Sequence, residues 1–157
     1  MKILIAEDDE DIMTTYKLLF GSTKHQLFTA NDGEEAVTIF DSEVSTIAGS
    51  HGEPVKDSLP FDLVILDYRM PKKNGIDVAN HILSVAPLQK IILASAYTHE
   101  LIEDRANKKT NLVMLQKPFE IDALLHLVEE STGESGKSRQ TSASSQSGGK
   151  FRMSESN

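Results

Sequence analysis

The sequence contains no cysteine, and this absence restricts the chemistry open to the chain. Structural disulfides, zinc sites built from thiolates and catalysis by a thiol are all excluded. Long hydrophobic runs are also missing. The first apolar run, Ile3–Ala6, is too short for a signal peptide, and no later run approaches the roughly eighteen apolar residues of a membrane span. We therefore expect a cytoplasmic protein with no membrane insertion.

Basic residues are scarce compared with acidic ones. The 157 residues include 16 Lys and Arg against 24 Asp and Glu, which gives a formal net charge of −8. Phosphate backbones are bound by clustered Lys and Arg, so we expect no direct contact with nucleic acid. Residues 1–130 carry 12 basic and 22 acidic side chains, so the acidity belongs to the part of the chain that has core-forming residues.

Short, continuous apolar runs recur along the chain and alternate with segments of helical spacing. Runs of this kind are typical of strands that are buried on both faces of a parallel sheet. The predicted fold is therefore an α/β, doubly wound, five-stranded parallel sheet with helices on both faces. The expected strands lie near residues 2–6, 26–30, 62–66, 90–94 and 112–115, and the expected helices near 12–20, 34–45, 76–83, 98–107 and 121–128.

Two segments do not fit this compact unit, which we expect to span residues 1–130. Residues 46–60 contain Gly49, Gly52, Pro54 and Pro60 among polar side chains, which indicates a long loop insertion. Residues 131–157 contain nine serines and four glycines but almost no apolar side chains. Such a segment buries too little surface to offset the entropy of ordering, so we expect a disordered tail.

Carboxylates follow two of the predicted strands, at the ends where parallel strands converge. Glu7 and Asp8 come after the first run, and Asp67 comes after the third. Three carboxylates in one place repel one another unless a cation is present. Oxygen ligands with open positions for water and phosphate favour Mg²⁺ over a dedicated Ca²⁺ cage. A second interpretation of the acidic run at 7–11 is the first turn of a helix, where acids are favoured by capping and by the helix dipole.

Asp67, Ser95 and Lys117 follow three different apolar runs and are candidates for phosphoryl chemistry. A carboxylate can attack a phosphoryl donor and form an acyl phosphate. That transfer depends on positioning and on neutralising the equatorial oxygens of the phosphoryl group. Lys117 offers an ammonium and Ser95 a hydroxyl for this purpose. Each residue taken alone also fits a solvated surface lysine or a turn serine, and only their shared position at strand ends favours the functional interpretation.

With these residues in place, the chain resembles the receiver domains of two-component response regulators. The match covers residues 1–130 in the family's order and has five parts. These are Glu7-Asp8, the segment Leu66–Pro71 around Asp67, Asn74-Gly75, Ser95-Ala96 and Lys117-Pro118-Phe119.

The resemblance implies a flavodoxin-like receiver fold and a role for each site residue. Asp67 would be the phosphoacceptor, Ser95 the switch hydroxyl and Lys117 the partner of the phosphate. Mg²⁺ would be held by Glu7, Asp8, Asp67 and the backbone carbonyl of Arg69. The peptide bond before Pro118 would be cis.

The same resemblance implies a signalling role in a phosphorelay. The phosphate would come from a histidine kinase or a histidine phosphotransfer protein, and phosphorylation would switch binding to an unknown downstream protein. The protein would not be an enzyme beyond self-phosphorylation from small donors and self-dephosphorylation. Because no output domain follows in the sequence, we expect a single-domain regulator.

Some features depart from the family pattern or leave other functions open. Met114 stands where the family usually has Tyr or Phe, which puts the usual aromatic switch in doubt. One alternative is a phosphate-independent scaffold, although the acceptor, the acidic pair and the lysine are all present. Another is an aspartyl-phosphate phosphatase of the haloacid-dehalogenase type, but Asp67-Tyr68-Arg69 lacks the second acid of that family's motif.

Overall fold

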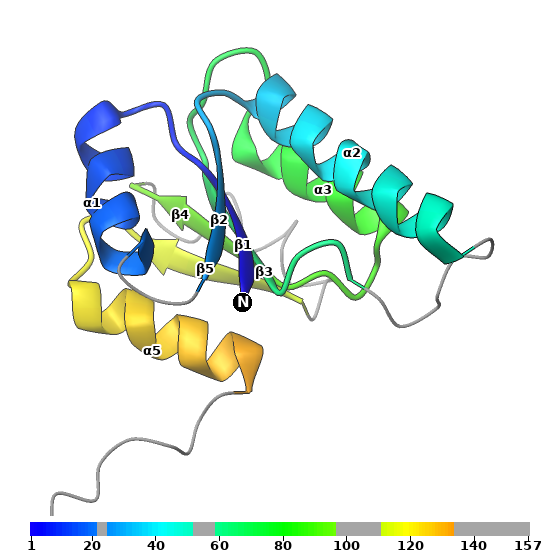
Figure 1. The fold of residues 1–157 in the computed structure, drawn as a ribbon. Helices are drawn as coiled ribbons and strands as arrows, with labels where there is room; N and C mark the ends of the chain where they lie inside the picture. The colour runs from blue at the N-terminus through cyan, green and yellow to red at the C-terminus, as the bar shows by residue number, and fades with distance from the viewer. Residues whose placement is uncertain (22–24, 52–58, 97–110, 134–157) are drawn as a thin grey trace, which may run out of the picture.

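The computed structural model describes residues 1–21, 25–51, 59–96 and 111–133. Within them, five parallel strands form one sheet in the order β2-β1-β3-β4-β5 (Figure 1). The strands are β1 (Lys2–Ala6), β2 (Gln26–Ala30), β3 (Leu63–Asp67), β4 (Ile91–Ser95) and β5 (Leu112–Gln116). The helices of this part of the chain are α1 (Glu10–Gly21), α2 (Gly33–His51), α3 (Gly75–Val85) and α5 (Ile121–Thr132). The predicted doubly wound parallel sheet is confirmed.

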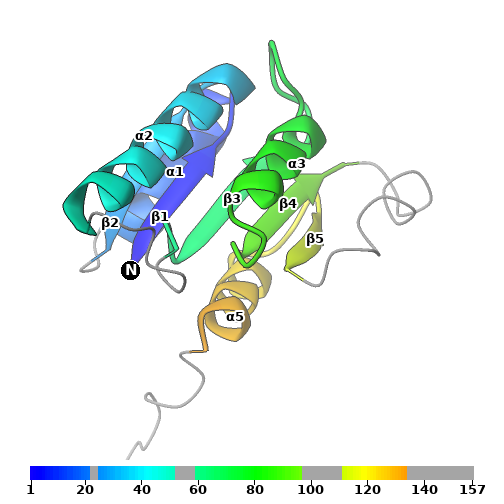
Figure 2. The ribbon, with the colours of Figure 1, turned by 90° about the vertical axis from the view of Figure 1, so that its right-hand side faces the viewer.

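Helices cover both faces of the sheet, and the core is divided accordingly. Figure 1 shows α1 and α5 on one side and α2 and α3 on the other, and Figure 2 looks onto the face that α2 and α3 cover. Strand β3 supplies both sides: Leu63 and Ile65 pack towards α1 and α5, whereas Val64 and Leu66 pack towards α2 and α3. Its alternate side chains point to opposite faces, which explains why β3 is a continuous apolar run.

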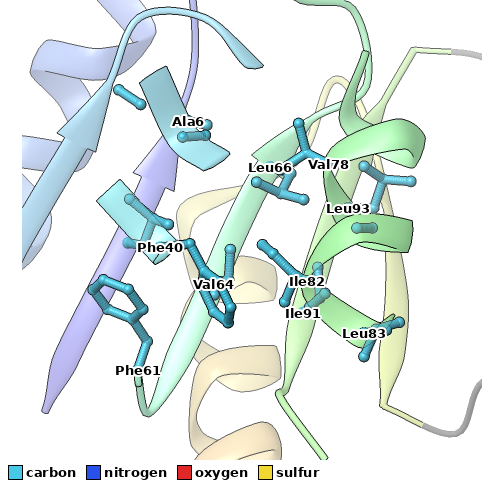
Figure 3. Packing of buried hydrophobic residues seen from close by; sticks show 14 of the residues in the cluster. Ala6, Phe40, Phe61, Val64, Leu66, Val78, Ile82, Leu83, Ile91 and Leu93 are labelled. Atoms are coloured by element: carbon cyan, nitrogen blue, oxygen red, sulfur yellow. The ribbon is translucent and has the colours of Figure 1, made fainter. Parts of the chain in front are cut away.

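The core beneath α2 and α3 is closed at one end by aromatic rings. Figure 3 shows Phe40 of α2 and Phe61, just before β3, next to Val64. The two ring centroids are 6.0 Å apart. At the same end, buried Gln89 donates to the carbonyl of Phe61 at 2.8 Å and accepts from its amide at 3.3 Å. The segments that lead into β3 and β4 are thereby joined.

Helix α2 is longer than the sequence suggests. We expected a helix over 34–45 and a loop over 46–60, but α2 continues to His51, so the prediction of a loop is wrong for residues 46–51. The physical reason is that Phe40, Val44 and Ile47 keep helical spacing and lie at least partly buried. One glycine inside a helix, here Gly49, costs only about 1 kcal/mol, which such packing can offset.

The carboxyl-terminal helix also runs slightly further than expected. Helix α5 continues through Thr132, and Gly133 ends it in the left-handed conformation with φ of 74°. The expected tail began at residue 131. Residues 134–157, most of residues 52–60 and the expected helix at 98–107 lie outside the described residues. Across the ranges that are described, none of the helices combines the length and the apolarity that crossing a bilayer requires.

Candidate active site

The predicted site residues meet at the carboxyl ends of four strands. Glu7 follows β1, Asp67 ends β3, Ser95 ends β4 and Lys117 follows β5. Backbone hydrogen bonds hold these ends in register. The Tyr68 amide donates to the Ala94 carbonyl at 2.8 Å, and the Lys117 amide donates to the Ser95 carbonyl at 2.7 Å. The expected convergence of residues that lie far apart in the sequence is therefore observed.

Lys117 is the centre of the site. Its ammonium donates to Oδ1 of Asp67 at 2.7 Å and to Oε2 of Glu7 at 2.9 Å. The side chains of both acids are almost fully buried. A buried carboxylate is tolerated only when it is paired, and here one ammonium serves two of them.

The other oxygen of Asp67 is held by its own loop. The backbone amide of Arg69 donates to Oδ2 of Asp67 at 2.8 Å. Both oxygens of this carboxylate are therefore oriented, one by Lys117 and one by Arg69. The guanidinium-bearing side chain of Arg69 is exposed, so the backbone of Arg69 faces the site.

Three carboxylates are close enough to share one ion. Oxygens of Glu7, Asp8 and Asp67 lie within 4.8 Å of one another, and the Asp8 side chain is exposed. An all-oxygen set with one solvent-accessible member suits a hard divalent cation that keeps part of its water shell, as Mg²⁺ does. The donor set therefore fits the predicted cofactor.

Burial and charge perturb the ionisation of the pair formed by Glu7 and Lys117. Burial raises the pKa of Glu7; the hydrogen bond from Lys117 opposes this rise, and the charge of Asp67 adds to it. For Lys117, burial alone would lower the pKa, but the hydrogen bonds to Asp67 and Glu7 outweigh it, so its pKa is raised. The lysine is thus held as a cation beside two acids.

The acidic run at 7–11 divides into two roles. Glu7 and Asp8 belong to the carboxylate cluster. Asp9 instead caps α1, because its Oδ1 accepts from the amides of Asp11 at 2.9 Å and Ile12 at 3.0 Å. Glu10 and Asp11 lie in the first turn of α1. The helix-start interpretation is therefore confirmed for Asp9, Glu10 and Asp11, whereas the metal-binding role of Glu7 and Asp8 stays a prediction.

The segments on either side of the site have defined local geometry. The peptide bond between Lys117 and Pro118 is cis, as the resemblance implies. On the other side, Asn74 caps α3 by accepting from the Asp77 amide at 2.9 Å. The Gly75 amide, at the start of α3, donates to the Tyr68 carbonyl at 2.9 Å. This bond holds α3 against the end of β3.

Sequence reasoning missed one residue near the site. Tyr16 has the spacing of an apolar core residue of α1, and its side chain does lie in the core. Its hydroxyl, however, is buried and has no hydrogen-bond partner among the described residues. Burial raises the pKa of Tyr16, and the charges of Glu7 and Asp67 raise it further. Neither its spacing nor its residue type could have revealed a phenol beside the acids.

A family model now identifies the class of protein to which this fold and site belong. The model of the response regulator receiver domain matches residues 3–129, so the chain belongs to that family. The protein is therefore a receiver of two-component signal transduction, as the motifs predict.

Two of the curated relatives are transcriptional regulatory proteins of greater length. Transcriptional regulatory protein PdtaR of Mycobacterium tuberculosis is 31% identical over 131 residues, which is 82% of this chain and 55% of the relative. Transcriptional regulatory protein CpxR of Klebsiella pneumoniae is 30% identical over 94 residues, 60% of this chain and 33% of the relative. The chain thus spans about half of the first relative and a third of the second.

Solved structures show the same fold at low sequence identity. The receiver domain of Francisella response regulator 1452 is similar with a TM-score of 0.66 and 23% identity, over 86% of this chain and 98% of that one. A chain of the CheX–CheY–BeF3–Mg²⁺ complex from Borrelia burgdorferi is similar with a TM-score of 0.67 and 24% identity, over 83% of this chain and 87% of that one.

Proposed function

We propose that Asp67 accepts a phosphoryl group from a histidine kinase or a histidine phosphotransfer protein in the cytoplasm. The phosphorylated receiver would then bind a downstream protein differently from the free one. The observation that carries this proposal is the position of Lys117, 2.7 Å from Asp67 and 2.9 Å from Glu7, beside a cluster of three carboxylates. A nucleophile, a cation for its product and a set of metal ligands are thereby brought together.

The cofactor of this reaction would be Mg²⁺, held by Glu7, Asp8, Asp67 and the backbone carbonyl of Arg69. Support comes from the spacing of the three carboxylates and from the turn that brings the Arg69 backbone to Asp67. When bound, Mg²⁺ would supply positive charge to the equatorial oxygens of the transferred group.

In the proposed transfer, a carboxylate oxygen of Asp67 attacks the phosphorus of a phosphohistidine. The new O–P bond forms as the N–P bond of the donor breaks, and the imidazole nitrogen that leaves takes up a proton. Lys117 then pairs with the phosphoryl oxygens, and the Ser95 hydroxyl donates to one of them. Attack of water on phosphorus restores the carboxylate, so the protein acts as a phosphoacceptor with self-dephosphorylation and has no other turnover.

Signal output would begin at Ser95, whose carbonyl is already bonded to the amide of Lys117. A shift of Lys117 towards the phosphoryl group is thereby coupled to the end of β4. Met114 is partly buried against the core beneath α2 and α3. A flexible thioether cannot hydrogen-bond as a tyrosine hydroxyl does, so the proposed switch uses Ser95 in place of an aromatic residue.

The test is stoichiometric labelling by acetyl phosphate, followed by intact-protein mass spectrometry with and without Mg²⁺. We expect one phosphoryl group per chain, dependent on Mg²⁺ and absent from Asp67→Asn protein. Asp77→Asn is the matched control, because Asp77 is an exposed acid at the start of α3 and should label normally. Labelling of Asp67→Asn protein at the wild-type level would contradict the proposal.

Two further measurements test the role of Lys117 and the class of reaction. Lys117→Ala should slow labelling about 100-fold, the usual cost of removing one preorganised donor to a developing charge. Product release from a small aryl phosphate distinguishes a phosphoacceptor from a phosphatase. A single burst of product per chain fits an acceptor, whereas sustained turnover would mean that the protein is a phosphatase.

A further inference from the structure

A pocket of about 370 Å³ opens between α1 and the start of α5. Most of its described lining is apolar, including Ile12 and Leu19 of α1 and Phe119, Ile121 and Leu124 at the start of α5. Its volume is in the range that holds a small molecule or a large aromatic side chain. One wall is Lys117, so the pocket adjoins the candidate active site without being part of it.

Tyr16 lines the pocket, but its hydroxyl offers no donor to a ligand there. That hydroxyl is shielded from solvent and has no partner in the part of the chain that the structure describes. Tyr16 therefore adds to the apolar wall of the pocket.

Exposed acids stand next in sequence to one lining residue of each helix. Glu10 and Asp11 precede Ile12 on α1, and Glu120 and Asp122 stand on either side of Ile121 at the start of α5. Lys117, the one basic side chain of the described lining, is already paired with Glu7 and Asp67. The pocket therefore selects an apolar group that is flanked by positive charge.

The chain carries one segment of this composition. Residues 134–157 contain a single aromatic residue, Phe151, and it lies between Lys150 and Arg152. Seventeen residues lie between Gly133, the cap of helix α5, and Phe151. Extended chain reaches about 3.3 Å per residue, whereas α5 rises only about 1.5 Å per residue, so the segment can return to the start of α5.

We propose that Lys150-Phe151-Arg152 docks in the pocket between α1 and α5. The Phe151 ring fills the apolar space, and the two basic side chains meet the exposed acids. Tethering raises the effective concentration of the segment to the order of millimolar, so even weak intrinsic affinity gives substantial occupancy.

Docking itself is tested by methyl NMR of the full chain. A docked ring shifts the methyl signals of Ile12, Leu19 and Ile121, and Phe151→Ala should move these signals away from their wild-type positions. Met153→Ala, a nearby change in the same tail, should leave them unchanged. Identical methyl signals in wild-type and Phe151→Ala protein would overturn the proposal.

The contribution of the basic side chains to docking is tested with two matched double variants. Lys150→Ser/Arg152→Ser and Lys137→Ser/Arg139→Ser remove the same charge from the same tail. Only the first pair should reproduce the methyl shifts of Phe151→Ala, and added salt should act in the same direction. Equal effects of the two pairs would show that no defined segment docks.

The last measurements distinguish docking within one chain from contact between copies, and they distinguish failure of docking from failure of the proposed function. Methyl positions that change on dilution would show contact between copies and would overturn docking within one chain. Absence of labelling in every variant would contradict the proposed function, whereas the methyl shifts would still test docking.

Discussion

Gly75 stands so close to Asp67 that no side chain fits between them. A Cβ atom at Gly75 would lie 2.3 Å from the Asp67 carbonyl oxygen and 2.6 Å from Cδ1 of Leu93. The close approach brings α3 against the last residue of β3. Glycine at this position is therefore required by the contact between helix and strand, whatever its backbone angles.

Gly75→Ala should destabilise the protein by about 3 kcal/mol, because the methyl group must displace backbone at the end of β3. Gly49→Ala is the control. Nothing lies within 4 Å of a Cβ at Gly49 in α2, so this change should stabilise by about 0.5–1 kcal/mol. Urea unfolding measures both changes. Equal midpoints for Gly75→Ala and wild-type protein would show that the contact is not tight.

Replacement of Gln89 by Leu should cost about 3 kcal/mol. The change leaves the amide and the carbonyl of Phe61 without their side-chain partner in a buried place. Gln26→Leu, at an exposed position of β2, makes the same chemical change and should have little effect. Urea unfolding of the two variants gives the comparison, and similar losses in both would refute the role assigned to the buried bonds.

Glu7→Gln should stabilise the metal-free protein at neutral pH. Burial raises the pKa of Glu7 above its usual value of 4.5. An acid with a raised pKa favours the folded state at low pH, and that contribution is lost as pH rises from 4.5 through the folded pKa. The amide avoids this loss, so its advantage should shrink as pH falls towards 4.5.

Mg²⁺ should make the wild type more stable than Glu7→Gln protein. An ion that binds only the folded state stabilises it, and the wild type offers one more carboxylate than the variant. Thermal unfolding with and without Mg²⁺ measures this effect. Glu10→Gln is the control, because Glu10 is exposed at the start of α1 and outside the carboxylate cluster. If Mg²⁺ stabilises Glu7→Gln protein as much as the wild type, Glu7 is not a ligand of the ion.

Tyr16 should contribute to loss of stability in alkali. Burial, with the charges of Glu7 and Asp67, raises the pKa of its phenol above the usual 10.0. The unfolded state then ionises first, so stability falls as pH rises above 10.0. Tyr16→Phe should flatten this alkaline fall, whereas Tyr68→Phe, at a half-buried position, is the control. Parallel curves for wild-type and Tyr16→Phe protein would contradict the assignment.

Sequence reasoning succeeded where the physics is local or follows directly from topology. The runs that became β1, β3 and β4 are apolar throughout because both faces are covered. Once the sheet is parallel, the carboxyl ends of its strands share one edge, so Asp67 and Lys117 are expected to converge there. The candidate residues were therefore predicted together with the fold, and their roles stay predictions.

Tertiary contacts account for what was missed. Gly49 suggested a loop, but partly buried Ile47 extends α2 beyond Val44. The sequence alone could not place Gln89 against Phe61, because 28 residues separate them and neither belongs to a motif. The unpaired hydroxyl of Tyr16 likewise depends on which groups surround it in space.

The division of β3 between the two sides of the core bears on how the molecule responds to a change at its end. Leu63 and Ile65 belong to one cluster, Val64 and Leu66 to the other, and Asp67 is the next residue of the same strand. If Asp67 gains charge, as we propose, the change acts on a strand that both helical layers share. We therefore expect the two layers to respond to it together.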